Sequence, residues 1–102
     1  MSRPFLPYGR QSIDDSDIEA VAQVLRSDWL TTGPAVDAFE ADFAACTGAS
    51  HAIACSNGTT ALHLALAGLD VGPGDVCLVP ASTFMATANA AISCRAGGVF
   101  LD

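Results

Sequence analysis

Lysine is absent from the 102-residue chain, and its only permanent cations are four arginines. Eleven acidic residues outnumber them and give a formal net charge of −7. Proteins that bind nucleic acid usually present basic patches, because contacts with the phosphate backbone supply much of their affinity. We therefore expect a chain that binds no nucleic acid.

The chain also has no long apolar run and no cysteine spacing typical of a metal site. No stretch approaches the roughly 18 apolar residues of a membrane span, and the first residues contain no apolar segment of a signal peptide. The four cysteines show neither C-x-x-C spacing nor pairing with histidine. These absences predict buried reduced thiols, no metal site, no membrane contact and a cytoplasmic protein.

Charged residues are scarce for so short a chain. They make up 15% of the sequence, and apolar residues make up 51%, whereas about 25% is charged in an ordinary soluble domain. A small domain has much surface for its volume and should be more polar than average. In addition, residues 98–102 read as a buried strand with nothing after it. We expect the N-terminal part of a longer protein.

Apolar spacing predicts two helices in the first half of the chain. The first is expected over residues 16–27, where Ser16 and Glu19 have the spacing of a capping box. The second begins at Pro34, a residue suited to a first helical turn, and is ended by Gly48. An extended arm should precede these helices, and a loop should join them.

From residue 51 onward, short apolar runs alternate with helical patterns. We expect, in order, a strand over residues 51–55, a helix over 59–69, a strand over 76–80, a helix over 84–94 and a strand over 98–101. Short connections favour parallel strands joined by right-handed crossovers, which makes the fold class α/β. The strands lack polar–apolar alternation and residues 61–69 of the first of these helices are apolar nearly all round, so we expect these elements to be buried.

The junction that follows the first expected strand has the features of a phosphate site. Its sequence is SNGTTALHLAL, in which Asn57 and Gly58 tolerate the positive φ of a sharp turn. Thr59 and Thr60 place hydroxyls beside the free N–H groups of a helix start, where the helix dipole favours anions. An ordinary N-cap without a ligand is the alternative interpretation.

A second feature follows the next strand, where Phe84 places an aromatic ring near the carboxyl end of the sheet. A phosphate at Gly58–Thr60 and a flat ring against Phe84 would together hold a phosphorylated aromatic cofactor. The alternative is that Phe84 belongs to the core.

Taken together, the pattern resembles the DegT/DnrJ/EryC1/StrS family of pyridoxal-phosphate-dependent sugar aminotransferases, which has the type I fold. The matching pieces, in the family's order, are LTTGPAVDAFEADFA, SNGTTALHLAL, VGPGD, VPASTFMATANA and GGVFLD. The resemblance implies the N-terminal part of the large domain. Residues 1–34 would form the arm, first helix and substrate-facing loop, and residues 35–102 the truncated start of the cofactor-binding α/β domain.

The resemblance also implies roles for individual residues. Gly58 and Thr59 would bind the phosphate of pyridoxal 5'-phosphate (PLP), Thr60 would assist, and Phe84 would stack on the pyridine ring. The arm tyrosine and the loop before the second helix would approach the sugar nucleotide. The implied substrate-binding residues are Tyr8, Asp28, Trp29, Leu30 and Thr31.

The implied activity is amino transfer, with glutamate as donor, to a nucleotide-linked keto-deoxy sugar by a homodimer. That chemistry needs a Schiff-base lysine, and the chain has none, so we expect no catalytic residue within it and no activity from these 102 residues alone. Three alternatives stay open. They are a sugar dehydratase of the same family in which histidine replaces the lysine, a non-catalytic phosphate- or nucleotide-binding α/β module, and a fragment that pairs with a longer relative.

Overall fold

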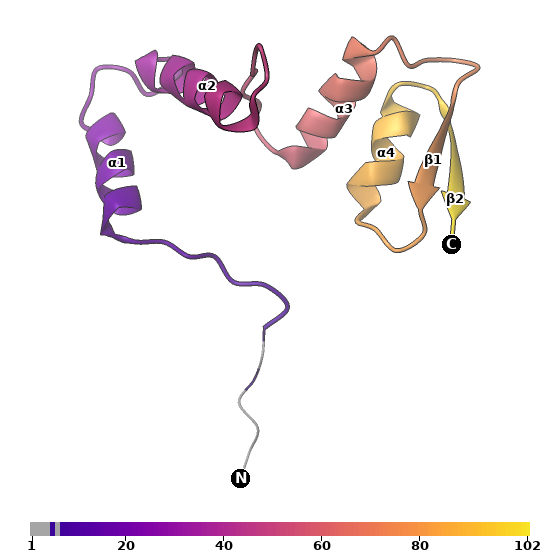
Figure 1. The fold of residues 1–102 in the computed structure, drawn as a ribbon, viewed down its shortest axis with the longest axis horizontal. Helices are drawn as coiled ribbons and strands as arrows, with labels where there is room; N and C mark the ends of the chain where they lie inside the picture. The colour runs from indigo at the N-terminus through magenta and orange to yellow at the C-terminus, as the bar shows by residue number, and fades with distance from the viewer. Residues whose placement is uncertain (1–4, 6) are drawn as a thin grey trace. The chain divides into compact units, whose positions relative to one another are not determined.

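The computed structural model describes residue 5 and residues 7–102. Within them the chain forms α1 (Asp15–Leu25), α2 (Pro34–Thr47), α3 (Gly58–Gly68), β1 (Val76–Pro80), α4 (Met85–Ser93) and β2 (Gly97–Leu101) (Figure 1). The chain divides into two compact units, Met1–Ala52 and Ile53–Asp102. No helix in the described part is long and apolar enough to cross a membrane.

The capping box of helix α1 begins at Asp14, two residues before the predicted one. The carboxylate of Asp14 accepts hydrogen bonds from the backbone N–H groups of Ser16 (2.8 Å) and Asp17 (3.2 Å), and the Asp17 carboxylate accepts from the Asp14 N–H (3.0 Å). The capping box therefore runs from Asp14 to Asp17, and the prediction of Ser16 with Glu19 is wrong. An aspartate carboxylate satisfies the first orphan N–H groups, so the serine hydroxyl instead donates to Asp14.

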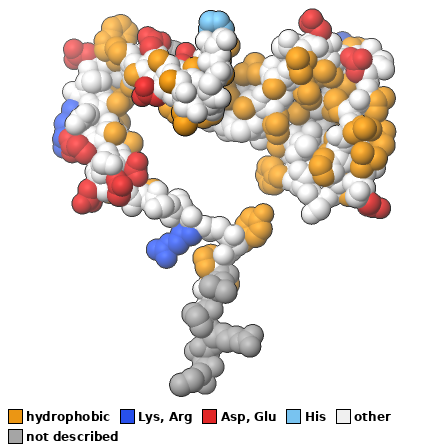
Figure 2. Space-filling view, viewed as in Figure 1, with side chains coloured by type: hydrophobic (Ala, Val, Ile, Leu, Met, Phe, Trp, Pro, Cys, Tyr) orange, Lys and Arg blue, Asp and Glu red, His pale blue; other side chains and the backbone are white. Residues whose placement is uncertain are grey.

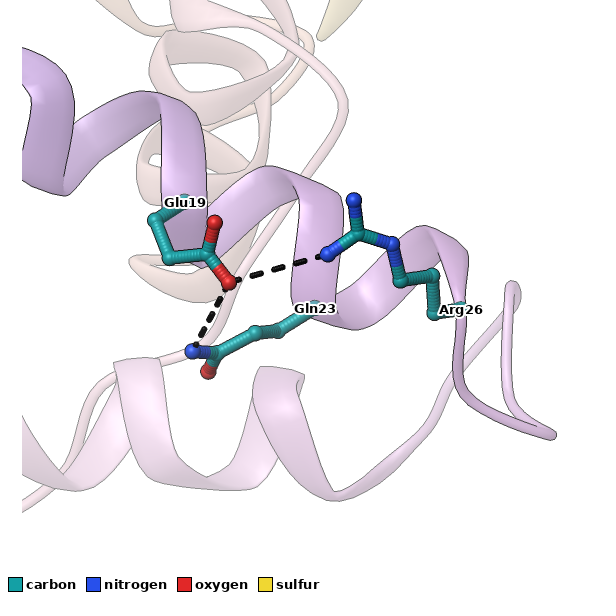
Figure 3. Close-up of polar contacts among 3 residues, drawn as sticks. All are labelled: Glu19, Gln23 and Arg26. Atoms are coloured by element: carbon teal, nitrogen blue, oxygen red, sulfur yellow. Dashed lines mark hydrogen bonds and ion pairs between the residues drawn. The ribbon is translucent and has the colours of Figure 1, made fainter.

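Glu19 lies on the outer surface of α1, where it binds two side chains of the same helix end (Figure 3). Its Oε1 atom accepts a hydrogen bond from Gln23 Nε2 at 3.4 Å and lies 3.7 Å from Arg26 Nη1. The side chains of the ion pair are 75% (Arg26) and 57% (Glu19) exposed. Exposed pairs of this kind contribute about 0–1 kcal/mol, so Glu19 has little influence on the stability of α1.

Helix α2 begins and ends where Pro34 and Gly48 predict. Pro34 occupies the first turn, and the chain leaves the helix at Gly48 with a left-handed φ of +72°. Helices α3 and α4 end in the same way, but with Asp70 (φ +58°) and Arg95 (φ +61°) in the left-handed position. In all three, the next N–H donates to the carbonyl five residues earlier, at 3.0–3.1 Å.

The second unit is built on two parallel strands. β1 pairs with β2 in the register Val76↔Gly97 to Pro80↔Leu101, and α4 makes the crossover between them. Helix α4 packs on both strands and on α3, and Figure 1 shows both helices running opposite to the strands. The side chains buried in this packing are Val79, Ala86, Ala90, Ala91 and Ala96.

The predicted strand over residues 51–55 is wrong. The structure assigns no strand there, and the sheet of the described residues consists of β1 and β2 alone. A strand requires a ladder of hydrogen bonds with a neighbour, and neither β1 nor β2 pairs with this segment. The α/β class and the crossover from β1 to β2 are confirmed, while the first crossover of the expected series is not formed.

The predicted burial is also wrong for α3 and β2, and in β1 it holds for Val79 alone. No residue of α3 is buried, and every residue of β2 is exposed. A strand that is apolar on both faces needs a covering layer on each, and among the described residues α4 covers one. Figure 2 shows the result as a concentration of hydrophobic side chains over α4 and the strands. The cysteines follow this pattern, since Cys46 and Cys55 are exposed and Cys77 and Cys94 are half-buried.

The N-cap residue Asp14 is expected to make the stability of α1 depend on pH. Hydrogen bonds to Asp14, first from the Ser16 hydroxyl and then from the Asp17 and Ser16 N–H groups, hold its pKa below the usual 3.8. Because the folded pKa is depressed, the contribution of Asp14 to stability is present above pH 3.8 and is lost as the pH falls below it. We expect Ser16→Ala to raise the Asp14 pKa in an NMR titration and Ser16→Thr to leave it low. An unchanged pKa in Ser16→Ala would contradict this assignment.

Candidate functional site

The start of α3 is an N-cap made by Asn57. This residue is extended (φ −169°, ψ 168°), and its Oδ1 atom accepts a hydrogen bond from the Thr60 N–H at 2.9 Å. Gly58 is the first helical residue. The expectation that Asn57 and Gly58 adopt positive φ is therefore wrong, because an extended cap residue turns the chain directly into the helix.

Three hydrogen-bond donors remain open at this turn. Among the described residues, no hydrogen bond joins the N–H of Gly58, the N–H of Thr59 or the Thr59 hydroxyl to another group. Both residues are exposed, and Thr60 is half-buried. Two adjacent backbone donors and one hydroxyl on a helix start are a donor set that suits a phosphate.

Space is also open beside these donors. A Cβ atom added to Gly58 would meet no atom within 4 Å, and its φ does not require glycine. The first turn of α3 carries no acidic residue, whereas α1 has Asp15 and Asp17 there and α2 has Asp37. The positive end of the α3 dipole is thus left without an anion from its own first turn.

Phe84 lies where β1 gives way to α4. It is the N-cap residue of α4, with its carbonyl accepting the Thr87 N–H at 3.0 Å and its ring 78% exposed. The ring lines a groove of about 360 Å³ together with Asn89, Ile92 and Phe100. Phe84 is therefore exposed and does not belong to the core of this chain. Phe84 lies in the same unit as the open donors of Gly58 and Thr59, each at the start of a helix.

The predicted substrate-facing residues lie in the first unit. Tyr8 is fully exposed, and the four loop residues Asp28, Trp29 (61%), Leu30 (66%) and Thr31 are exposed as well. The structure brings the loop residues together between α1 and α2, and it places Gly58, Thr59, Thr60 and Phe84 in the other unit.

Two residues that the sequence interpretation missed fix this loop. The Ser27 hydroxyl donates to the Val24 carbonyl at 2.7 Å and accepts from the Trp29 N–H at 3.2 Å. A Cβ atom on Gly33 would lie only 2.6 Å from Trp29 Cβ. A hollow of about 240 Å³ lies beside the indole, lined by Gln23, Val24, Ser27, Trp29, Pro34 and Ala35. The close approach at Gly33 could not be recognised from sequence, since its φ is ordinary.

Comparison with known proteins identifies the family to which the chain belongs. The sequence model of the DegT/DnrJ/EryC1/StrS aminotransferase family matches residues 11–102. The chain belongs to this family. A curated relative, the UDP-4-amino-4-deoxy-L-arabinose–oxoglutarate aminotransferase of Shewanella sediminis, is 45% identical over the whole chain, which covers 26% of that relative.

Solved aminotransferase structures share the fold. A Streptococcus pneumoniae protein assigned as a sugar aminotransferase, solved in its PLP form, matches 95% of the chain with a TM-score of 0.85 at 34% identity. The aminotransferase of Psychrobacter cryohalolentis matches 97% with a TM-score of 0.82 at 38% identity. The chain covers 25% of each structure, so it spans about a quarter of the length of these DegT-family relatives. The family is PLP-dependent, and PLP is its cofactor.

The contact between Gly33 and Trp29 predicts the effect of a single methyl group. Gly33→Ala should destabilise the loop by about 1–3 kcal/mol, because both Cβ atoms are fixed to the backbone and one segment must shift. The measurement is hydrogen exchange at residues 28–33 in the protein expressed from its full reading frame. Gly9→Ala, whose Cβ meets nothing within 4 Å, is the control. Equal exchange in the two variants would contradict the predicted clash.

Proposed function

We propose that this chain supplies the phosphate-binding turn and the ring-stacking aromatic of a PLP-dependent sugar aminotransferase. The observation that carries the proposal is the family match over residues 11–102, which coincides with an open donor set at the start of α3. Gly58 and Thr59 would hold the phosphate through two N–H groups and one hydroxyl, and Thr60 would support them. Phe84 would lie against the pyridine ring.

Within such an enzyme, the bound cofactor supplies an electron sink for moving an amino group between substrates. The residues of this chain bind and orient it. Donors at the α3 start fix the phosphate end, and an aromatic face at the α4 start restricts the tilt of the ring. With position and tilt both fixed, the reactive end of the ring keeps one direction relative to the substrate, which favours reaction.

The proposed acceptor is a nucleotide-linked keto-deoxy sugar, and the proposed amino donor is glutamate. Support comes from the Shewanella sediminis relative, whose name specifies a UDP-linked 4-amino-4-deoxy sugar and oxoglutarate. Tyr8 and the loop residues Asp28, Trp29, Leu30 and Thr31 are exposed and would contact this substrate. We further propose that the working enzyme is a homodimer.

The test is an amino-transfer assay on the protein expressed from its full reading frame. We expect PLP to be bound, and oxoglutarate to form from glutamate only when a UDP-linked 4-keto sugar is present. Loss of water from the sugar without oxoglutarate formation would instead indicate the dehydratase alternative. Absence of PLP binding would overturn the proposal and favour a non-catalytic module.

The open space at Gly58 gives a sharper test of the phosphate assignment. Gly58→Ala should leave the cofactor-free protein as stable as before, or more stable by up to about 1 kcal/mol, because alanine favours helix. Its methyl group would fill space beside the open N–H groups and so weaken PLP binding. Gly68→Ala is the matched control, since it makes the same change at the other end of α3 with nothing within 4 Å. Equal PLP affinity in the two variants would contradict the assignment.

A further inference from the structure

Three side chains at the start of α3 form a closed ring of hydrogen bonds. Asn57 Nδ2 donates to Ser56 Oγ at 3.2 Å, Ser56 Oγ lies 3.4 Å from Thr60 Oγ1, and Thr60 Oγ1 lies 3.1 Å from Asn57 Oδ1. The Asn57 Oδ1 atom also accepts the Thr60 backbone N–H. The ring thus includes the N-cap of the helix.

The chemistry of the three groups fixes the direction of every bond in this ring. The Thr60 N–H can only donate, so the carbonyl oxygen of the Asn57 carboxamide must face it, and the NH₂ group must face Ser56. Asn57 Oδ1 carries no proton, so the Thr60 hydroxyl donates to it. Because Thr60 has a single hydroxyl proton, Ser56 must be the donor in the remaining bond.

This direction has a consequence for phosphate binding. The proton of Thr60 and the proton of Ser56 are both committed to the ring, and neither is available to an anion. Donors outside the ring are the N–H groups of Gly58 and Thr59 and the Thr59 hydroxyl. Bonds in a closed ring polarise one another, so the arrangement also holds the turn in one conformation.

Resting on the proposed function, we infer that Asn57 is the positioning residue of the PLP site and that Ser56 and Thr60 act through it. The neutral carboxamide caps α3 without placing a charge beside the phosphate. Thr60 contributes by holding this carboxamide in place, and Thr59 is the side chain that donates to the phosphate directly. An aspartate would cap the helix equally well but would repel the dianion.

The first test separates the cap from its charge in the protein expressed from its full reading frame. Asn57→Asp keeps an acceptor for Thr60, and its second carboxylate oxygen can accept from the Ser56 hydroxyl in place of the lost Nδ2 donor, so the unfolding temperature of the cofactor-free protein should be unchanged or higher. Its PLP dissociation constant should rise about tenfold or more, because two like charges are brought together. Pyridoxal, which lacks the phosphate, should bind as it does to the wild type. PLP binding within twofold of wild type would overturn the inference.

The second test separates the ring from direct donation. Ser56→Ala opens the ring without altering Asn57 or Thr60, and Ser56→Thr keeps the hydroxyl. We expect Ser56→Ala to lower the unfolding temperature and to weaken PLP binding about three- to tenfold, with pyridoxal binding unchanged. Ser56→Thr should restore both properties. Equal PLP affinity in these two variants would show that the ring does not position the donors and would overturn that part of the inference.

Thr59→Val is the variant to compare with the ring variants, because the Thr59 hydroxyl makes no hydrogen bond in the described structure. It should lower PLP affinity at an unchanged unfolding temperature, whereas the ring variant Ser56→Ala changes both. A wild type that takes up no PLP would overturn the proposed function itself. Wild-type uptake with an unaffected Asn57→Asp variant would overturn only the positioning role of Asn57.

Discussion

The close packing of α4 on the paired strands is the contact on which the second unit depends. The helix presents Ala86, Ala90 and Ala91 to its neighbours, and all three are buried. Side chains this small let a helix axis approach closely, which leaves Val79 of β1 only 2% exposed. A helix so fixed along its length also has a fixed first turn. Phe84, the N-cap residue of α4, is consequently held near the carboxyl end of β1.

The fold was predictable from sequence wherever the signal is local. The bounds of β1 and the ends of α2 were predicted correctly, because a Gly-Pro-Gly-Asp turn, a proline and a glycine mark them. Residues 51–55 have an equally apolar sequence but form no strand, since strand pairing depends on a neighbour distant in sequence. Burial of α3 failed for the same reason, because apolar composition shows that a face needs cover but not which segment provides it.

In the candidate site, too, residues in local sequence motifs could be predicted, whereas residues whose roles depend on the folded structure could not. Gly58, Thr59 and Phe84 could be proposed as site residues from sequence because each lies in a motif next to an element boundary. The capping role of Asn57 was missed, since asparagine followed by glycine is also typical of a left-handed turn. Ser27 and Gly33 were missed because their roles depend on distances to Trp29 that only the folded loop defines. The family match supports the motifs without testing these residues one by one.

The second unit contains few of the acidic residues that give the chain its net charge of −7. Eight of the eleven acidic residues precede residue 53, and residues 53–102 contain only Asp70, Asp75 and Asp102 besides Arg95. The carboxylate of Asp75 already accepts the Gly72 N–H at 2.8 Å. The first turn of α3 itself carries no acidic residue, so its oriented N–H groups present the positive end of a helix dipole to an anion although the chain as a whole is acidic.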